Sequence, residues 1–263
     1  MDRLTGSLDN RLAIVTGAGS GIGRATARLL AAHGAHVVVN DLVPERAKET
    51  VAQVSSEGGS AEEYAGDVTL SAFVDQLVAD VVATWGRLDI LHSNAGAGLA
   101  QGPLVSIEDD GWQADLALNL SASFFFLRAA LRAMVPAGRG SIICTASVAG
   151  LAAVPGVAPY GSAKAGLLQL VRSAAVEYGP KGIRVNAVVP GSVESARFTS
   201  RVGGEERLAA YKRQIPLGRT VTAHDVAEAV LWLASDASAC VTGIALPVDG
   251  GMGAKLAQPY LGD

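Results

Sequence analysis

The sequence 11-RLAIVTGAGSGIGRATARLLAAHGAHVVVND-41 contains an apolar run, a glycine-rich turn, a helical pattern and a second apolar run. It predicts strands at Leu12–Thr16 and His36–Asn40, with a helix at Gly21–His33 between them. Glycines at such a turn let the backbone approach a pyrophosphate closely. The N-terminus of the following helix offers N–H groups and a positive dipole end to that anion. The stretch therefore predicts a dinucleotide-binding unit.

The glycine turn follows the spacing GxxxGxG rather than the commoner GxGxxG. Because the turn lies between a strand and a helix, where the mechanism requires it, we favour a nucleotide site over a simple tight turn. The residues of the turn that we expect to contact the cofactor are Gly17, Ser20, Gly21, Ile22 and Gly23.

Two aspartates follow the next two predicted strands. Asp41 comes after the second strand, where a carboxylate can bind the ribose hydroxyls of NAD and repel a 2′-phosphate. Leu42 and Val43 follow it, with no Arg or Lys alongside, so we predict NAD(H) rather than NADP(H). Asp67, with Val68, is expected to contact the adenine. Each aspartate has an alternative role as a cap of the following helix.

Apolar strand-like runs alternate with helical patterns along the whole chain, and the runs are continuous rather than alternating in polarity. The further predicted strands are Ser60–Ala65, Leu88–Ser93, Gly140–Ala146, Arg184–Val189 and Ile244–Val248, and the further helices are Pro44–Glu57, Ser71–Trp85, Ile107–Met134, Pro159–Tyr178 and Ala223–Ser235. Continuous apolar strands are typical of a parallel sheet buried on both faces. The pattern predicts an α/β, Rossmann-type doubly wound sheet of about seven strands with helices on both faces, formed by residues 1–263 as a single domain.

The composition excludes several classes of protein. The 263 residues are 49% hydrophobic and 17% charged with a net charge of −4, which argues against a disordered chain and against a nucleic-acid binder. Cys144 and Cys240 lie far apart in the sequence and suggest reduced thiols, with no metal site. The polar N-terminus does not resemble a secretory signal. Pro155, Pro159 and glycines interrupt the charge-free stretch 141–163, which argues against a membrane span. We therefore expect a cytoplasmic protein that binds small molecules.

Further motifs extend the argument beyond the nucleotide site. They are TGAGSGIG at 16–23, NAG at 94–96, Asn119, Ser147, Tyr160-x-x-x-Lys164, Pro190-Gly191 and VDGG at 248–251. In this order and spacing, the chain resembles the short-chain dehydrogenase/reductase family over nearly its whole length. The resemblance implies an NAD-dependent oxidoreductase that transfers a hydride between nicotinamide and a secondary alcohol or ketone.

The resemblance also implies four catalytic residues. Tyr160 and Lys164 are four residues apart in a helical segment and so share one face. An ammonium about 5 Å away is expected to lower the phenol's pKa from ~10 by roughly two units, which would let Tyr160 exchange a proton with the alcohol. By resemblance, Ser147 holds the substrate oxygen and Asn119 holds a water that relays protons past Lys164.

The same family pattern assigns further cofactor contacts. Tyr160 and Lys164 are included because Lys164 is expected to bond the nicotinamide ribose. The others are Asn94, Ala95 and Gly96 near the adenosine ribose, and Pro190, Gly191, Val193 and Ser195 around the nicotinamide. The chain departs from the usual pattern at Ser93, Ala163 and Ser195, none of which removes a reacting group.

The substrate side is expected to be apolar and uncharged. The wall residues that we predict are Ser147, Ala149, Val154, Tyr160 and Ser192. The segment 192–214 is expected to form a mobile lid. Its Arg197 and Arg201 are expected to lie on a solvated face, with gripping of a substrate carboxylate or phosphopantetheine as the alternative.

The helices predicted at Ile107–Met134 and Pro159–Tyr178 are apolar on more than one side. Since one sheet covers only one side of a helix, we expect a second subunit to cover the rest, in a homodimer or homotetramer.

Two other functions remain open at this stage. The first is a 3-oxoacyl-thioester reductase that uses NADPH, acting on acyl carrier protein or CoA substrates. The second is a non-catalytic nucleotide-binding or scaffold protein, which we would expect to show a degenerate site.

Overall fold

The computed structural model describes residues 8–194, 198 and 202–255. Seven strands form one parallel sheet in the order β3-β2-β1-β4-β5-β6-β7. The strands are β1 Leu12–Val15, β2 His36–Val39, β3 Ser60–Glu63, β4 Ile90–Ser93, β5 Gly140–Thr145, β6 Ile183–Pro190 and β7 Ala245–Val248. The doubly wound sheet predicted from the alternating pattern is confirmed.

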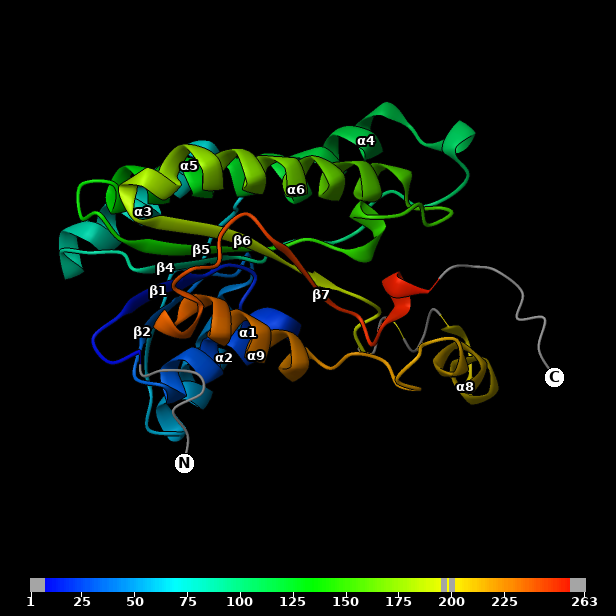
Figure 1. Cartoon of the computed structure of the whole chain (residues 1–263), viewed down its shortest axis with the longest axis horizontal. Helices are drawn as coiled ribbons and strands as arrows, with labels where there is room; N and C mark the ends of the chain where they lie inside the picture. The colour runs from blue at the N-terminus through cyan, green and yellow to red at the C-terminus, as the bar shows by residue number, and fades with distance from the viewer. Residues whose placement is uncertain (1–7, 195–197, 199–201, 256–263) are drawn as a thin grey trace.

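Helices cover both faces of this sheet (Figure 1). The helices on one face are α1 Gly21–Ala32, α2 Pro44–Ser56 and α9 Ala223–Ala234, and those on the other are α3 Ser71–Trp85, α4 Asp109–Leu116, α5 Ala122–Met134 and α6 Ala158–Tyr178. A further helix, α8 Glu205–Arg213, lies away from the sheet, close to the C-terminal end of β7 (Figure 1). Short helical turns at Leu104–Ser106, Val148–Gly150, Gly179–Lys181, Asp236–Ser238 and Met252–Ala254 connect these elements.

The continuous apolar runs of the strands divide between two cores. In β5, Ile142 and Cys144 pack with the α3–α5–α6 face, whereas Ile143 packs with the α1–α2–α9 face. Successive side chains of a strand point to opposite faces. A strand buried on both sides therefore needs apolar residues at every position, which explains the runs seen in the sequence.

The strand order reverses at the centre of the sheet. The chain runs outward from β1 to β2 and β3, and then returns to place β4 on the other side of β1. In open α/β sheets, ligands bind beyond the carboxyl ends of the strands at such a reversal. This places the glycine turn after β1 next to the segments that follow β4, β5 and β6.

The helix predicted at Ile107–Met134 begins at Asp109 and is not regular throughout. Between α4 and α5, residues Ala117–Ser121 form a π-helical turn, and Asn119 lies within it. Such turns occur often at functional sites. The whole helix Asp109–Met134 is long and apolar enough to cross a membrane by composition alone. Here it packs against the sheet as a core helix, with Phe126 and Leu127 buried.

Candidate active site

The glycine turn brings backbone close to backbone. Gly17 has φ +60°, and a Cβ on it would lie 2.9 Å from the Cα of Ala95. A Cβ on Gly23 would lie 2.3 Å from the carbonyl oxygen of Gly17. Neither position tolerates a side chain without movement of the backbone. The turn therefore leaves the N-terminus of α1 open to an anion, as a dinucleotide pyrophosphate requires.

Asp41 points its carboxylate at this turn. Its Oδ2 accepts a hydrogen bond from the Gly19 N–H at 2.9 Å, and its Oδ1 accepts one from Val43 N–H at 3.0 Å. The structure also corrects one expectation, because an arginine does stand beside Asp41. A Cβ on Gly19 would lie 2.6 Å both from Asp41 Oδ2 and from the Cβ of Arg46, which α2 folds back over the turn.

The position of Asp67 fits both roles considered for it. Its Oδ1 accepts hydrogen bonds from the Thr69 N–H at 2.8 Å and from the Thr69 hydroxyl at 2.7 Å, which fixes the turn before α3. Val68 is buried beside it.

Asn94 braces the central strands as expected. Its Nδ2 donates to the carbonyl oxygen of Thr16 at 3.0 Å, and its Oδ1 accepts from the Thr145 hydroxyl at 3.0 Å. The same hydroxyl accepts from Nε2 of His92 at 2.9 Å. Burial lowers the pKa of His92 to about 3, so the ring is neutral at pH 7. This chain of bonds joins the C-terminal ends of β1, β4 and β5.

Ser147, Tyr160 and Lys164 meet where β5 ends and α6 begins. The helical turn Val148–Gly150 packs directly on α6 and carries Ser147 to the Tyr160 hydroxyl, with which it hydrogen-bonds. The Lys164 ammonium lies 5.7 Å from the centre of the Tyr160 ring and donates to the Thr145 carbonyl at 2.7 Å. The structure therefore brings together the reacting groups that sequence analysis selected.

The expected acidity of Tyr160 is not found. Burial raises the pKa of the phenol, the Ser147 hydrogen bond lowers it, and the charge of Asp115 raises it further. Lys164 is itself buried, which lowers its own pKa to about 8. In the protein alone, desolvation outweighs the attraction of one ammonium because it penalises both charged forms.

Asn119 lies fully buried on the π-helical turn. Its Nδ2 donates to the Ala97 carbonyl at 2.8 Å, and its Oδ1 accepts from the Ala97 N–H at 3.1 Å. A Cβ on Gly96 would lie 2.8 Å from Asn119 Oδ1 and 3.2 Å from Lys164 Nζ, so both polar atoms approach one point. This placement suits the relay role implied by the family pattern.

Two adjoining cavities share Ser147, Tyr160 and Gly191. The smaller one has a volume of about 190 Å³, and its other lining residues are Ile22, Asn94, Gly96, Thr145, Ala146, Lys164, Pro190 and Val193. The larger one has a volume of about 340 Å³ and extends away from the glycine turn. Tyr160 therefore stands between a space on the nucleotide side and a space on the substrate side.

The larger cavity contains the predicted wall residues Ala149, Val154 and Ser192. Sequence analysis missed several others: Gly98, Gln101, Val148, Val157, Phe198, Tyr211 and Met252. Tyr211 arrives from α8, hydrogen-bonds with Ser192 and stacks edge-on against Phe198. No local sequence signal marks these residues, because they come from separate segments. The predicted contacts Ser195, Arg197 and Arg201 lie outside the described residues.

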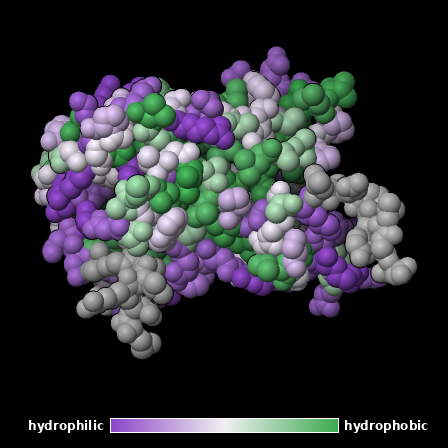
Figure 2. Space-filling view, in the orientation of Figure 1, coloured by the Kyte–Doolittle hydropathy of each residue, from purple (hydrophilic) through white to green (hydrophobic). Residues whose placement is uncertain are grey.

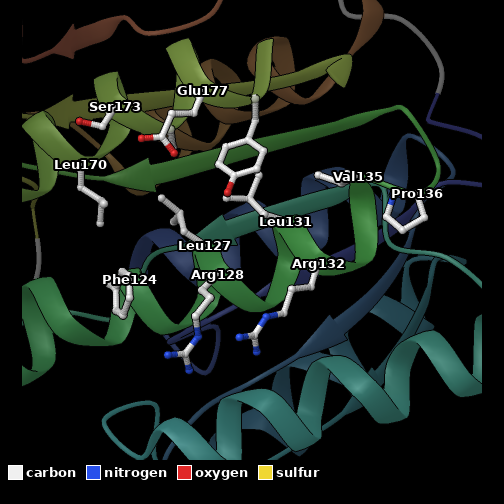
Figure 3. A pocket seen from close by; sticks show the side chains of 12 residues that line it. Phe124, Leu127, Arg128, Leu131, Arg132, Val135, Pro136, Leu170, Ser173 and Glu177 are labelled. Atoms are coloured by element: carbon white, nitrogen blue, oxygen red, sulfur yellow. The ribbon is translucent and has the colours of Figure 1, made fainter. Parts of the chain in front are cut away.

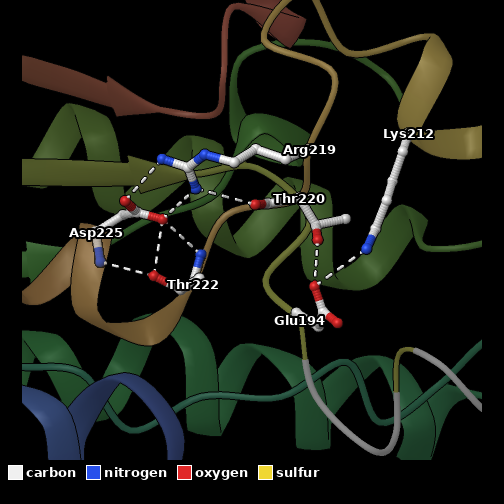
Figure 4. Close-up of polar contacts among 6 residues, drawn as sticks. All are labelled: Glu194, Lys212, Arg219, Thr220, Thr222 and Asp225. Atoms are coloured by element: carbon white, nitrogen blue, oxygen red, sulfur yellow. Dashed lines mark hydrogen bonds and ion pairs between the residues drawn. The ribbon is translucent and has the colours of Figure 1, made fainter.

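The two ends of the proposed lid are joined at its base (Figure 4). Val193 and Val221 form a β-bridge, and Glu194 accepts hydrogen bonds from the Thr220 hydroxyl at 2.7 Å and from Lys212 Nζ at 3.4 Å. Nearby, Thr222 and Asp225 form a capping box that begins α9. The chain thus leaves the sheet and returns to it at one anchored point.

The largest hollow of the described structure, about 680 Å³, lies elsewhere, between α5 and α6 (Figure 3). Phe124, Leu127 and Leu131 face it from α5, and Leu170 faces it from α6. We refer to this surface, with its remaining lining residues Arg128, Arg132, Val135, Pro136, Ser173, Ala174, Glu177 and Tyr178, as the α5–α6 groove. None of the predicted catalytic residues lines it. Within the described residues, no cluster of three or more His, Cys, Asp or Glu side chains could hold a metal ion.

Comparison with known proteins agrees with this geometry. A family model described as enoyl-(acyl carrier protein) reductase matches residues 17–253. The chain is 39% identical over 246 residues to 2,5-dichloro-2,5-cyclohexadiene-1,4-diol dehydrogenase of Sphingobium indicum, covering 93% of this chain and 97% of that protein. It is also 35% identical over 245 residues to the 3-oxoacyl-[acyl-carrier-protein] reductase of Thermotoga maritima, covering 93% and 98%.

Solved structures show the same architecture. Carveol dehydrogenase from Mycobacterium avium, in complex with NAD, superposes with a TM-score of 0.90 at 33% identity and covers 94% of this chain and 99% of that chain. The chain therefore belongs to the short-chain dehydrogenase/reductase family. It is an oxidoreductase that acts on alcohol-type substrates.

Proposed function

We propose that this protein is an NAD-dependent secondary-alcohol dehydrogenase or ketone reductase, with an apolar, uncharged substrate. The observation that carries the proposal is the position of Tyr160 between two cavities, hydrogen-bonded to Ser147 and one helical turn from Lys164. The glycine turn and Asp41 would hold the dinucleotide, whose nicotinamide ring, when bound, supplies or accepts the hydride.

The chain's own residues manage the proton and the oxygen. The Ser147 hydroxyl holds the substrate oxygen beside the Tyr160 hydroxyl, which takes the proton of an alcohol or returns it to a ketone. Because Lys164 is largely protonated below pH 8, its ammonium favours the phenolate form during this transfer. Asn119 holds a water near Lys164 and passes the proton onward.

The choice of NAD over NADP depends on Asp41 and Arg46. The Asp41 carboxylate would accept hydrogen bonds from the ribose hydroxyls and repel a 2′-phosphate. Arg46 acts in the opposite direction, since its guanidinium makes no hydrogen bond or ion pair within the described part of the chain. We propose that NAD is preferred, because Asp41 is fixed by two backbone N–H groups whereas the Arg46 head is unconstrained.

The assembly follows from the α5–α6 groove. Its walls are mainly apolar, and Phe124 at its rim is 43% exposed. Hydrophobic residues also gather across the middle of the face shown in Figure 2, at the level of the edge strand β7. We propose that second copies of the chain cover these surfaces in a homodimer or homotetramer, located in the cytoplasm. Segment 192–214 of a single-domain chain acts as a lid hinged at Glu194 and Thr220.

Initial rates over a panel of secondary alcohols, measured with NAD and with NADP, test the proposal. We expect reduction of NAD with cyclic, uncharged alcohols and slower reduction of NADP. Failure to oxidise any alcohol, or to reduce any corresponding ketone, with either cofactor would overturn it.

A 3-oxoacyl-thioester reductase is the second candidate, favoured by the Thermotoga maritima relative and by the unpaired Arg46. It predicts faster turnover of acetoacetyl thioesters with NADPH than of any ketone in the panel with NADH. A non-catalytic nucleotide-binding role would instead leave both assays blank while NADH still binds.

A further inference from the structure

Asp115 is a buried acid to which the sequence gave no role. It lies on α4, one helical turn before Asn119, and its side chain is fully buried. None of the ion pairs within the described residues includes it. Burying an ionisable group without a counter-charge costs free energy unless hydrogen bonds satisfy it. Its partners therefore indicate what the residue does.

Two of these partners belong to the loop that follows β4. Asp115 Oδ2 accepts from the Ala100 N–H at 2.8 Å and from the Leu99 N–H at 3.2 Å. The flanking residues Gly98 and Gln101 line the larger cavity. The carboxylate therefore clamps one wall of the substrate cavity from behind.

The third partner is the side-chain amide of Asn119, whose Nδ2 donates to Asp115 Oδ1 at 3.0 Å. An ionised carboxylate accepts hydrogen bonds but cannot donate them, so it fixes which end of the amide faces it. The Asn119 oxygen is thereby turned toward Gly96, where it and Lys164 Nζ approach the same point. Without Asp115, the Ala97 backbone alone would hold the amide, and it accommodates either orientation.

We propose that Asp115 is a positioning residue for the reaction, which holds the Asn119 oxygen toward Lys164 and clamps the Leu99–Ala100 wall of the substrate cavity. The inference rests on the proposed roles of Asn119 and Tyr160.

The charge of Asp115 provides a readout that separates this role from simple structural support. Asp115 on α4 raises the pKa of the Tyr160 phenol, in addition to the effect of burial. The other ionisable groups close to this centre are Lys164 on α6 and Cys144 on β5, which interact with each other. Removing the charge should therefore ease deprotonation of Tyr160.

The test compares Asp115→Asn with Asp110→Asn, an exposed acid on the same helix. In Asp115→Asn, an NH₂ group must face either the Asn119 amide or the loop N–H groups, so one contact is lost. We expect kcat for alcohol oxidation to fall about 10-fold, as for the loss of one buried hydrogen bond in the transition state. The alkaline rise of the kcat–pH profile should move to lower pH, and the KM for the alcohol should rise while that for NAD is unchanged.

In Asp110→Asn, kcat, KM and the pH profile should all match the wild type. A folded Asp115→Asn enzyme with wild-type kcat, KM and pH profile would overturn the inference. Asn119→Ala, assayed alongside, separates the two levels of the argument. Full turnover in Asn119→Ala refutes the proposed role of Asn119, whereas lost turnover in Asn119→Ala with an unchanged Asp115→Asn refutes only the role of Asp115.

Two further measurements keep the question open to refutation if Asp115→Asn does not fold. Asp115→Ser leaves space for a water that can accept from the loop N–H groups, and it should show the same shift in the pH profile. In the wild-type enzyme, hydrogen exchange followed by mass spectrometry should show slow exchange of a peptide covering Leu99 and Ala100. Fast exchange of that peptide would contradict the clamp.

Discussion

The two principal hollows of this molecule differ in size and in chemistry. The α5–α6 groove, at about 680 Å³, exceeds either cavity at the strand ends, yet no pair of reacting groups converges there. The cavities around Tyr160 are smaller but combine a phenol, an ammonium and a hydroxyl supplied by β5 and α6. Volume therefore does not locate the chemistry. Convergent polar groups at the carboxyl ends of parallel strands do.

The same contrast explains how each hollow is built. The groove needs only two apolar helix faces, and its occupant can be another protein surface. The active-site cleft needs buried polar groups that are satisfied individually, such as Thr145, Asn94 and Asn119. Buried polar networks are costly when incomplete, so single changes should be felt most strongly in the cleft.

The largest expected effect is at the phenol. Tyr160→Phe removes the group that transfers the proton, and turnover should fall about 10²-fold or more, while NADH binding followed by fluorescence stays close to wild type. Tyr178→Phe is the matched control, because Tyr178 lies on the same helix but faces the groove. Equal turnover in Tyr160→Phe and Tyr178→Phe would refute the assignment of the cleft as the active site.

The next effect concerns the groove. Phe124→Glu places a charge on its exposed apolar rim, and the mass measured by light scattering should fall from an oligomer toward the 26.8 kDa of one chain. Val105→Glu, a comparable change at an exposed residue outside the groove, should leave the mass unchanged. A wild-type protein that is monomeric at micromolar concentration would show that the groove has another occupant.

At the nucleotide end of the cleft, Asp41→Ala should reduce the preference for NADH over NADPH by about 10-fold. This corresponds to about 1.4 kcal/mol, which is in the range of one charge-assisted hydrogen bond. Arg46→Ala should change the preference in the opposite direction by weakening NADPH binding. The ratio of kcat/KM values for the two cofactors measures both. If neither variant alters this ratio, the cofactor preference is set elsewhere.

The smallest effect should appear in stability at acid pH. The pKa of His92 is about 3 in the folded protein, against about 6.5 for an ordinary histidine, so the unfolded chain binds a proton that the native state excludes. The stability that neutral His92 provides is present above pH 6.5 and is lost as the pH falls toward 3. The loss amounts to up to about 1.4 kcal/mol per pH unit.

Urea unfolding at pH 7 and pH 5 measures this loss. His92→Asn, which cannot take up a proton, should lose less stability than the wild type between the two pH values. An equal loss in both proteins would contradict the role of His92.

Local patterns in the sequence determined much of this protein. The glycine turn, the continuous apolar strands and the spacing of Tyr160 and Lys164 are short-range features, because strand and helix periodicity act over a few residues. They were sufficient to predict the order of elements, the Rossmann-type sheet and the groups that meet at the end of β5. The boundaries shifted only slightly, as at Asp109, where the long helix begins.

Tertiary structure alone decided the environment of these groups. Folding placed Arg46 beside Asp41 and brought Tyr211 to the substrate cavity from a separate segment. It also buried Asp115 next to Asn119 and raised rather than lowered the pKa of Tyr160. Desolvation and long-range charge depend on which segments cover a residue, and that information is distributed over the whole chain rather than written beside the residue itself.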